Sequence, residues 1–193
     1  MVRTLNTLLQ LLWPLDSTAT VTHNISLVTS YKNTRYLFSY KEPDIQTLIK
    51  RTKYQADEQA AQQLAKHLDT FLDTLREDYV IIPMPVSYKR WRERGYNHIE
   101  LICKHSKYAT KIRSDILKKI HHTKQQTQVS KIERIQQQRG TFSCNKSQCQ
   151  ILPSLVILLD DVTTTGATMD AARSVILPHL PTHAKLICLS IAH

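Results

Sequence analysis

The chain has 193 residues, enough for one ordinary domain with a hydrophobic core. Apolar residues make up 41% of the sequence and charged residues 22%, values that exclude a wholly disordered or a fibrous chain. Lysine and arginine exceed aspartate and glutamate by 26 − 16, so the formal net charge is +10. This excess favours phosphate-bearing partners, which include nucleic acids, nucleotides, sugar phosphates and anionic membranes.

The first residues and the cysteines bear on the cellular compartment. Residues 5–15 are rich in leucine but interrupted by polar residues and a proline, a pattern that favours a short amphipathic helix over a signal peptide. No run approaches the ~20 apolar residues of a membrane span. The four cysteines form no C-x-x-C pair, which argues against a disulfide framework and a zinc site. We expect a cytoplasmic protein, and we assign no metal-ligating residues.

Strands and helices alternate along most of the chain. Apolar runs predict strands at residues 36–40, 79–82, 112–120, 155–159 and 186–191. The spacing of apolar residues predicts helices that begin at Pro43 and that cover residues 56–75, 99–108 and 168–177, with a basic loop over residues 83–97. This alternation predicts an α/β fold with a mainly parallel sheet. Residues 1–35 are predicted to form an N-terminal helix and linker appended to a domain of residues 36–193.

The most informative segment is VILLDDVTTTGAT at residues 156–168. Asp160 and Asp161 are expected where a buried strand ends, and ligands of open α/β sheets bind at that edge. The turn that follows leads into a helix, whose first N–H groups can hold a phosphate. Gly166 would let the backbone come close to that phosphate.

The threonines and acids of this segment suggest the kind of ligand. The hydroxyl groups of Thr164, Thr165 and Thr168 can donate to phosphate oxygens. Carboxylates repel a phosphate but accept hydrogen bonds from the vicinal hydroxyls of a ribose. The segment therefore predicts a ribose 5-phosphate site. The alternative is that the two acids only end a strand and that Thr165 or Thr168 caps the next helix.

A second group of residues lies in the predicted basic loop. Lys89, Arg90, Arg92 and Arg94 follow Pro83-Met84-Pro85, and arginine forks bind phosphate oxygens in pairs. The alternative is an ordinary solvated run of charges. Trp91 lies among these cations, either as a partly buried anchor or as a platform on which a base stacks.

The segment at residues 156–168 resembles the phosphoribosyl pyrophosphate (PRPP) signature of the type I phosphoribosyltransferases. The matching residues are Asp160, Asp161, Val162, Thr164, Thr165, Gly166 and Thr168, whereas Thr163 replaces the usual aliphatic residue. The resemblance implies that Asp160 and Asp161 are catalytic and that residues 164–168, Ala167 included, bind the 5′-phosphate. It also implies a three-layer fold with a mobile hood or loop over the site.

Two other segments are similar to those of ComF-type competence proteins, a branch of the same superfamily. Arg94, Gly95, Tyr96 and Asn97 match the end of the ComF basic segment. Gln126, Arg134 and Phe142 match a later segment, where Gln137 replaces the usual asparagine; a basic surface helix is the alternative there. ComF proteins commonly begin with a four-cysteine zinc ribbon, but no cysteine precedes Cys103 here.

The resemblance implies two functions. In the first, a phosphoribosyltransferase binds PRPP with Mg²⁺, holds the leaving pyrophosphate on Lys89, Arg90 and Arg94, and transfers ribose 5-phosphate to an unknown acceptor. No general base is obvious, although histidines lie at 98, 121 and 122. In the second, a DNA-uptake protein handles single-stranded DNA and retains PRPP binding as regulation or relic. Exposed sheet or helix faces also suggest a homodimer.

Overall fold

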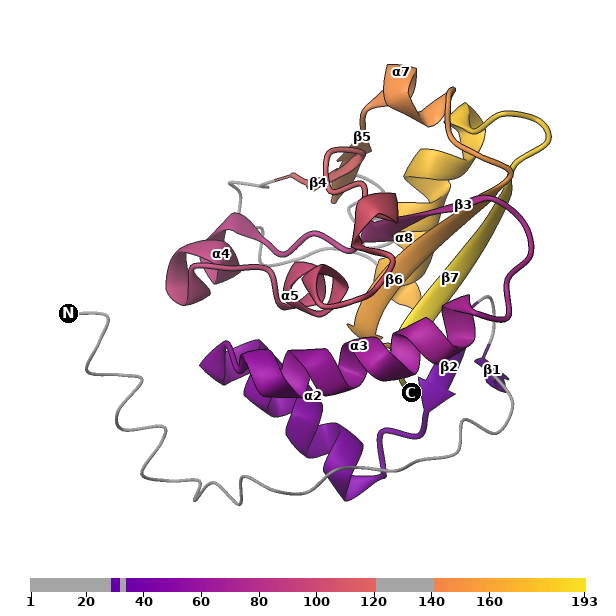
Figure 1. Ribbon diagram of the computed structural model, residues 1–193. Coiled ribbons are helices and arrows are strands. Elements are labelled where there is room, and N and C mark those ends of the chain that lie inside the picture. Colours follow the sequence, from indigo (N-terminus) through magenta and orange to yellow (C-terminus); the bar gives the residue numbers. More distant parts are fainter. Residues whose placement is uncertain (1–28, 32–33, 121–140) are drawn as a thin grey trace.

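The computed structural model describes residues 29–31, 34–120 and 141–193 (Figure 1). The predicted N-terminal helix, His121, His122 and the ComF-like residues Gln126, Arg134 and Gln137 lie outside the described residues, whereas Phe142 is described. Within the described ranges, no helix is both long enough and apolar enough to cross a membrane.

A five-stranded sheet forms the centre of the fold. Its strands, in spatial order, are β1 (Thr29–Tyr31), β2 (Thr34–Phe38), β7 (Lys185–Ala192), β6 (Leu155–Val162) and β3 (Tyr79–Pro83). Every neighbouring pair is parallel except β1 and β2, which run antiparallel. The predicted α/β class with a mainly parallel sheet is therefore confirmed. β1 and the first two residues of β2 precede residue 36 and pair within this sheet.

Helices cover both faces of the sheet, which gives the expected three layers (Figure 1). One face packs against α2 (Pro43–Gln55), α3 (Glu58–Leu72) and α5 (His98–Lys104). The other packs against α8 (Ala167–Ile176) and a small antiparallel pair, β4 (Leu117–Lys119) and β5 (Phe142–Cys144). The short helix α7 (Lys146–Cys149) and the 3₁₀ turns Ala109–Lys111 and Leu177–His179 complete the fold.

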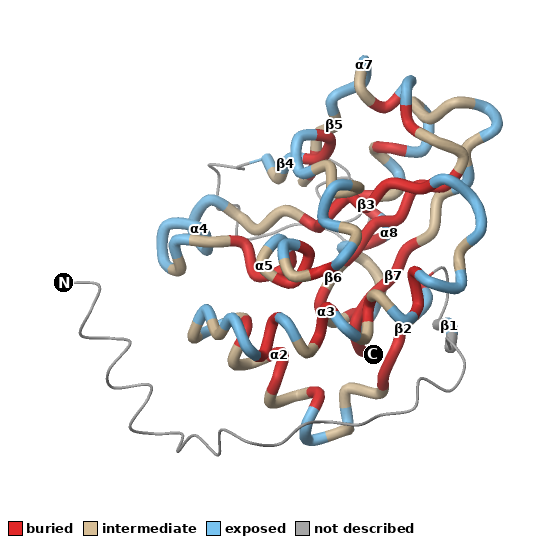
Figure 2. The backbone as a smooth tube through the Cα atoms, in the orientation of Figure 1, coloured by how far each residue is buried: buried red, intermediate tan, exposed pale blue. Residues whose placement is uncertain are grey.

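Strand β6 contributes side chains to both hydrophobic layers. Leu155, Ile157 and Leu159 belong to the cluster with α2, α3 and α5, whereas Val156 and Leu158 belong to the cluster with α8. Successive side chains of a strand point to opposite faces, so this alternation follows from the backbone. The burial colours of Figure 2 show β6 as one of the most deeply buried segments. The same alternation decides to which face of the sheet the side chains of the later β6 residues point.

Two predicted boundaries at the functional edge are wrong. β6 does not end before the two acids but continues through Val162, so Asp160 and Asp161 are strand residues. The predicted loop over residues 83–97 contains the helix α4 (Tyr88–Arg94). Ser87 caps this helix by accepting a hydrogen bond from the N–H group of Arg90, and Gly95 ends it in the left-handed conformation at φ 82°.

The predicted strand over residues 112–120 is also mostly wrong. Only Leu117–Lys119 forms a strand, and it pairs with β5 outside the central sheet. Ile112 makes one isolated parallel bridge to Ile81. The predicted helix at 99–108 begins at His98 and ends at Lys104, and the helix predicted over 56–75 covers Glu58–Leu72. The charges at Lys118 and Lys119 are compatible with β4 because that strand lies on the surface.

We expect Ile157→Ala to lower the free energy of unfolding by about 2–5 kcal/mol, because the removed methyl groups leave a cavity in the middle of the sheet. Ile157 is 0% exposed, whereas Ile151 is 70% exposed and provides the control. Denaturant unfolding of Ile151→Ala should differ from the parent by about 0.5 kcal/mol or less. Equal losses in the two variants would contradict this description of the core.

Candidate functional site

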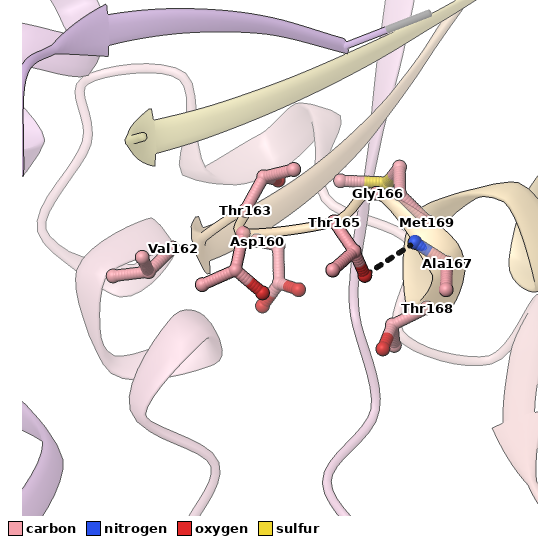
Figure 3. A pocket seen from close by; sticks show the side chains of 9 residues that line it. Asp160, Val162, Thr163, Thr165, Gly166, Ala167, Thr168 and Met169 are labelled. Carbon is pink, nitrogen blue, oxygen red and sulfur yellow. Dashed lines mark hydrogen bonds between the residues drawn. The ribbon is translucent and has the colours of Figure 1, made fainter. Parts of the chain in front are cut away.

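The turn between β6 and α8 forms a small hollow of about 50 Å³ at the carboxyl end of the sheet (Figure 3). Asp160 and residues 162–169 line it, so the segment singled out in the sequence folds around one space. Gly166 has φ 81° and is the N-cap of α8; its carbonyl accepts a hydrogen bond from the N–H group of Asp170 at 2.8 Å. A side chain at Gly166 would meet no close neighbour, so its backbone angle is what favours glycine.

The threonines of the turn differ in their surroundings. Thr164, Thr165 and Thr168 are exposed, and Figure 3 shows Thr165 and Thr168 beside the start of α8. The hydroxyl oxygen of Thr165 accepts a hydrogen bond from the N–H group of Ala167 at 3.4 Å. Thr163 is buried, and its carbonyl oxygen lies 2.7 Å from Nδ1 of His193. The exposed hydroxyl groups are thus the ones that the phosphate-binding prediction uses.

Asp160 is the one carboxyl group that lines the hollow. Burial raises the pKa of Asp160 to about 7, and the negative charge of Asp161 acts in the same direction. Oδ1 of Asp160 accepts a hydrogen bond from the N–H group of Asp161 at 2.9 Å. Burial and the charge of Asp161 both favour the protonated form of this carboxyl group.

Asp161 points to the opposite face of the sheet and is not among the residues that line the hollow. Its Oδ2 atom lies 2.5 Å from Nζ of Lys53 and 3.1 Å from Nε2 of His98. Burial by itself would raise the pKa of Asp161, but His98 and Lys53 outweigh burial and hold this pKa well below its usual range. Asp161 is therefore an ionised, buried anchor for a cation from α2.

His98 and Arg94 extend this buried polar cluster. The pKa of His98 is lowered, chiefly by burial and further by the charges of Lys53 and Arg94, whereas its contact with Asp161 acts in the opposite direction. Lys53 is a cation that balances the charge of Asp161. The guanidinium group of Arg94 lies 5.1 Å from the ring centroid of Tyr54, and its Nη1 atom is buried without a hydrogen-bond partner among the described residues.

The three predicted pyrophosphate-binding cations have different surroundings. Lys89 is 84% exposed and lies 4.0 Å from Glu93 on the same helix. Arg94 packs over Tyr54 of α2. The charge of Arg90 acts on Lys119 of β4, and so does the charge of Asp160.

Lys119 is a residue that sequence reasoning did not assign to the site. Its pKa is lowered by burial and by the positive charge of Arg90, while the charge of Asp160 acts in the opposite direction. Lys53 and His98 were also not assigned to the site. In the sequence, Lys53 is only a lysine near the end of the helix that begins at Pro43, and His98 is only a histidine close to the basic segment. Neither pattern is specific for a functional site.

The fold and the site define an α/β protein whose strand-to-helix turn encloses a small polar hollow. No family model matches the chain. A curated protein, Competence protein F of Haemophilus influenzae (strain ATCC 51907 / DSM 11121 / KW20 / Rd), is 31% identical over 140 residues, which are 68% of this chain and 60% of the relative. The chain thus matches less than two thirds of that relative's length. This finding confirms the predicted resemblance to ComF-type competence proteins.

Among solved structures, the chain is similar to one described as the allosteric regulatory enzyme of purine biosynthesis. The TM-score is 0.44 and the sequence identity 14%, over 72% of this chain and 30% of that chain.

Replacing Lys53 with methionine should lower the free energy of unfolding at pH 7 by about 3 kcal/mol, because Asp161 would remain buried without its charge partner. A lowered native pKa stabilises the fold above the unfolded pKa of about 4, and this stabilisation is lost as the pH falls through the native pKa. The difference between parent and Lys53→Met, measured by urea unfolding, should therefore shrink below about pH 4.

The control for this experiment is Lys185→Met. Lys185 pairs with Glu77 at 3.1 Å, but its side chain is 70% exposed, so its loss should cost about 1 kcal/mol or less. A Lys53→Met effect no larger than that of the control, or one that does not change with pH, would contradict the role given to Lys53.

Proposed function

We propose that the turn between β6 and α8 binds the phosphate of a ribose 5-phosphate ligand, and that PRPP is this ligand. The observation that carries the proposal is that Asp160 and residues 162–169 alone line one hollow at the start of α8. The first N–H groups of a helix lack intrahelical partners and carry a partial positive charge, which suits an anion. The exposed hydroxyl groups of Thr164, Thr165 and Thr168 add donors.

The two acids have different roles in this proposal. Asp160 faces the hollow, where its carboxylate would accept hydrogen bonds from ribose hydroxyl groups and favour positive charge on the sugar ring. Asp161 holds Lys53 on the other face and keeps the end of β6 in place. A direct contact of Asp161 with ribose stays a prediction.

The remaining charges suit a pyrophosphate with its Mg²⁺ ion. Arg90 and Lys119 are the cations whose charges act near Asp160, and guanidinium and ammonium groups both bind phosphate oxygens. The described residues contain no group of three or more side chains that could hold a metal ion, so the oxygens of PRPP itself would hold Mg²⁺. The ion would offset the charge of the leaving pyrophosphate.

The proposed reaction is displacement at the anomeric carbon of PRPP. An acceptor forms a bond to this carbon as the bond to pyrophosphate breaks, and pyrophosphate leaves with the bonding electron pair. Arg90, with Lys89 and Arg94 as the other predicted cations, would stabilise that leaving group. The thiols of all four cysteines are free and three of these residues are buried, which suits the reducing cytoplasm we expect. A homodimer stays a prediction.

Calorimetry with PRPP and Mg²⁺ tests the binding step. Asp160→Asn and the double variant Thr165→Ala/Thr168→Ala should each weaken binding by about 1.5–3 kcal/mol, the range for hydrogen bonds to charged groups. Thr182→Ala is the matched control, because Thr182 is exposed and lies outside the hollow. If the parent binds no PRPP, or if the hollow variants bind as well as the control, the proposal is wrong.

Pyrophosphate release separates transfer from mere binding. Incubation with PRPP, Mg²⁺ and a panel of nucleobases should release pyrophosphate in the presence of the right acceptor. PRPP binding without turnover on any acceptor would favour a ligand-binding role for the site.

Handling of single-stranded DNA is the second candidate function, and the exposure of Lys89, Arg90 and Arg92 on α4 favours it. Binding of an oligonucleotide through these cations should weaken as salt rises, with a log–log slope of about −0.7 for each phosphate neutralised. Fluorescence anisotropy between 50 and 200 mM salt measures this slope. A binding constant that does not change with salt would exclude this role for α4.

A further inference from the structure

A second, larger hollow lies between α4 and β4, outside the hollow at the β6–α8 turn. Its volume is about 380 Å³, within the range of small-molecule sites. Tyr88 and Trp91 of α4 line it together with Lys118 and Lys119 of β4. The two hollows share no lining residue. The charge of Asp160 in the first hollow nevertheless acts on the pKa of Lys119 in the second. Figure 1 shows where α4 and β4 lie in the fold.

The aromatic side chains of this hollow are not part of the hydrophobic core. Tyr88 is 55% exposed and Trp91 is 52% exposed, and α4 contains no buried residue. Trp91 is thus about half-buried, which fits both the partly buried anchor and the stacking platform expected from the sequence. The two rings lie nearly parallel, with an interplanar angle of 15° and a centroid distance of 6.4 Å. They present a flat apolar surface to the hollow that the packing of the domain does not explain.

Positive charges lie on both sides of these rings. The guanidinium group of Arg92 lies 5.8 Å from the ring centroid of Tyr88, and Lys118 and Lys119 line the side that β4 contributes. Burial and the charge of Arg90 lower the pKa of Lys119, so an incoming anion would relieve unfavourable interactions there. Glu100 is the acidic residue among those that line the hollow, and it can accept a hydrogen bond from an amino group.

We propose that this hollow binds a planar heteroaromatic base that carries a phosphate, with the base stacked on Trp91 and the phosphate on Lys118 and Lys119. Flat exposed rings bind the faces of bases, and the flanking cations bind the anion, so the pair of features fits nucleotides better than apolar ligands or peptides. A free mononucleotide and one nucleotide of a single strand share this chemistry. No residue lines both hollows, so the stacked base on Trp91 does not depend on PRPP binding; Lys119 is the one cation that both proposals use.

Trp91 fluorescence tests the inference directly. The chain has two tryptophans, so Trp13→Phe leaves Trp91 as the single reporter. Adenosine 5′-monophosphate or a 15-residue oligothymidylate should quench this emission in a saturable manner, whereas inorganic triphosphate should not. Trp91→Ala, followed by calorimetry, should weaken the binding of whichever ligand quenches by about tenfold, the scale of one stacked base. Ile151→Ala, which removes an exposed apolar side chain elsewhere, should leave it unchanged.

A comparison of the two ligands identifies the source of the base. Similar affinities for the mononucleotide and the oligonucleotide indicate a free nucleotide, and a much tighter, salt-sensitive oligonucleotide complex indicates a single strand. Lys119→Met should weaken the binding of adenosine 5′-monophosphate more than it weakens the binding of uncharged adenosine. If neither ligand quenches Trp91, or if triphosphate competes as well as they do, the inference is wrong. Trp91→Ala should leave PRPP affinity unchanged, and the double variant Thr165→Ala/Thr168→Ala should leave quenching unchanged, so failure of this inference is distinct from failure of the proposed function.

Discussion

The arrangement of the site depends on the two-residue alternation of strand β6. Because β6 continues through the acid pair, two carboxyl groups that are adjacent in the chain point to opposite faces of the sheet. Asp160 continues the series of Val156 and Leu158 toward α8, and Asp161 continues the series of Ile157 and Leu159 toward α2 and α5. Because of this alternation, Asp160 lines the hollow at the β6–α8 turn and Asp161 lies in the interior.

The interior acid links the sheet to a helical layer. Asp161 is 7% exposed, and an isolated carboxylate there would be costly, so its contact with Lys53 joins the end of β6 to the last turn of α2. The same contact balances the negative charge of Asp161 near the turn between β6 and α8. Asp160, by contrast, accepts a hydrogen bond from its neighbour's N–H group, and burial raises its pKa to about 7. The acid that lines the hollow is therefore the one whose charged form is disfavoured.

Helix α4 places a separate set of groups on the surface near this site. Its seven residues contain no buried side chain, so hydrophobic packing does not determine which residues occupy it. The helix is held instead by its caps at Ser87 and Gly95 and by the contact of Arg94 with Tyr54. Two of its exposed side chains, Tyr88 and Trp91, line the hollow between α4 and β4. Lys119 lines this aromatic hollow as well, and the charge of Asp160 in the hydroxylic hollow acts on it.

The sequence by itself determined the α/β class, the central strands and the turn around Gly166, because apolar periodicity and a glycine-containing strand-to-helix turn are local patterns. It did not determine the end of β6, since Asp160 and Asp161 are poor strand residues whose extended conformation is fixed by pairing with β7. Nor did it reveal the partners Lys53, His98 and Lys119, because each reaches the site from a different segment. Only the tertiary structure decided which acid lines the hollow and which cations act on the two acids, because electrostatic interactions depend on the distance between charges in space and not on their separation along the chain.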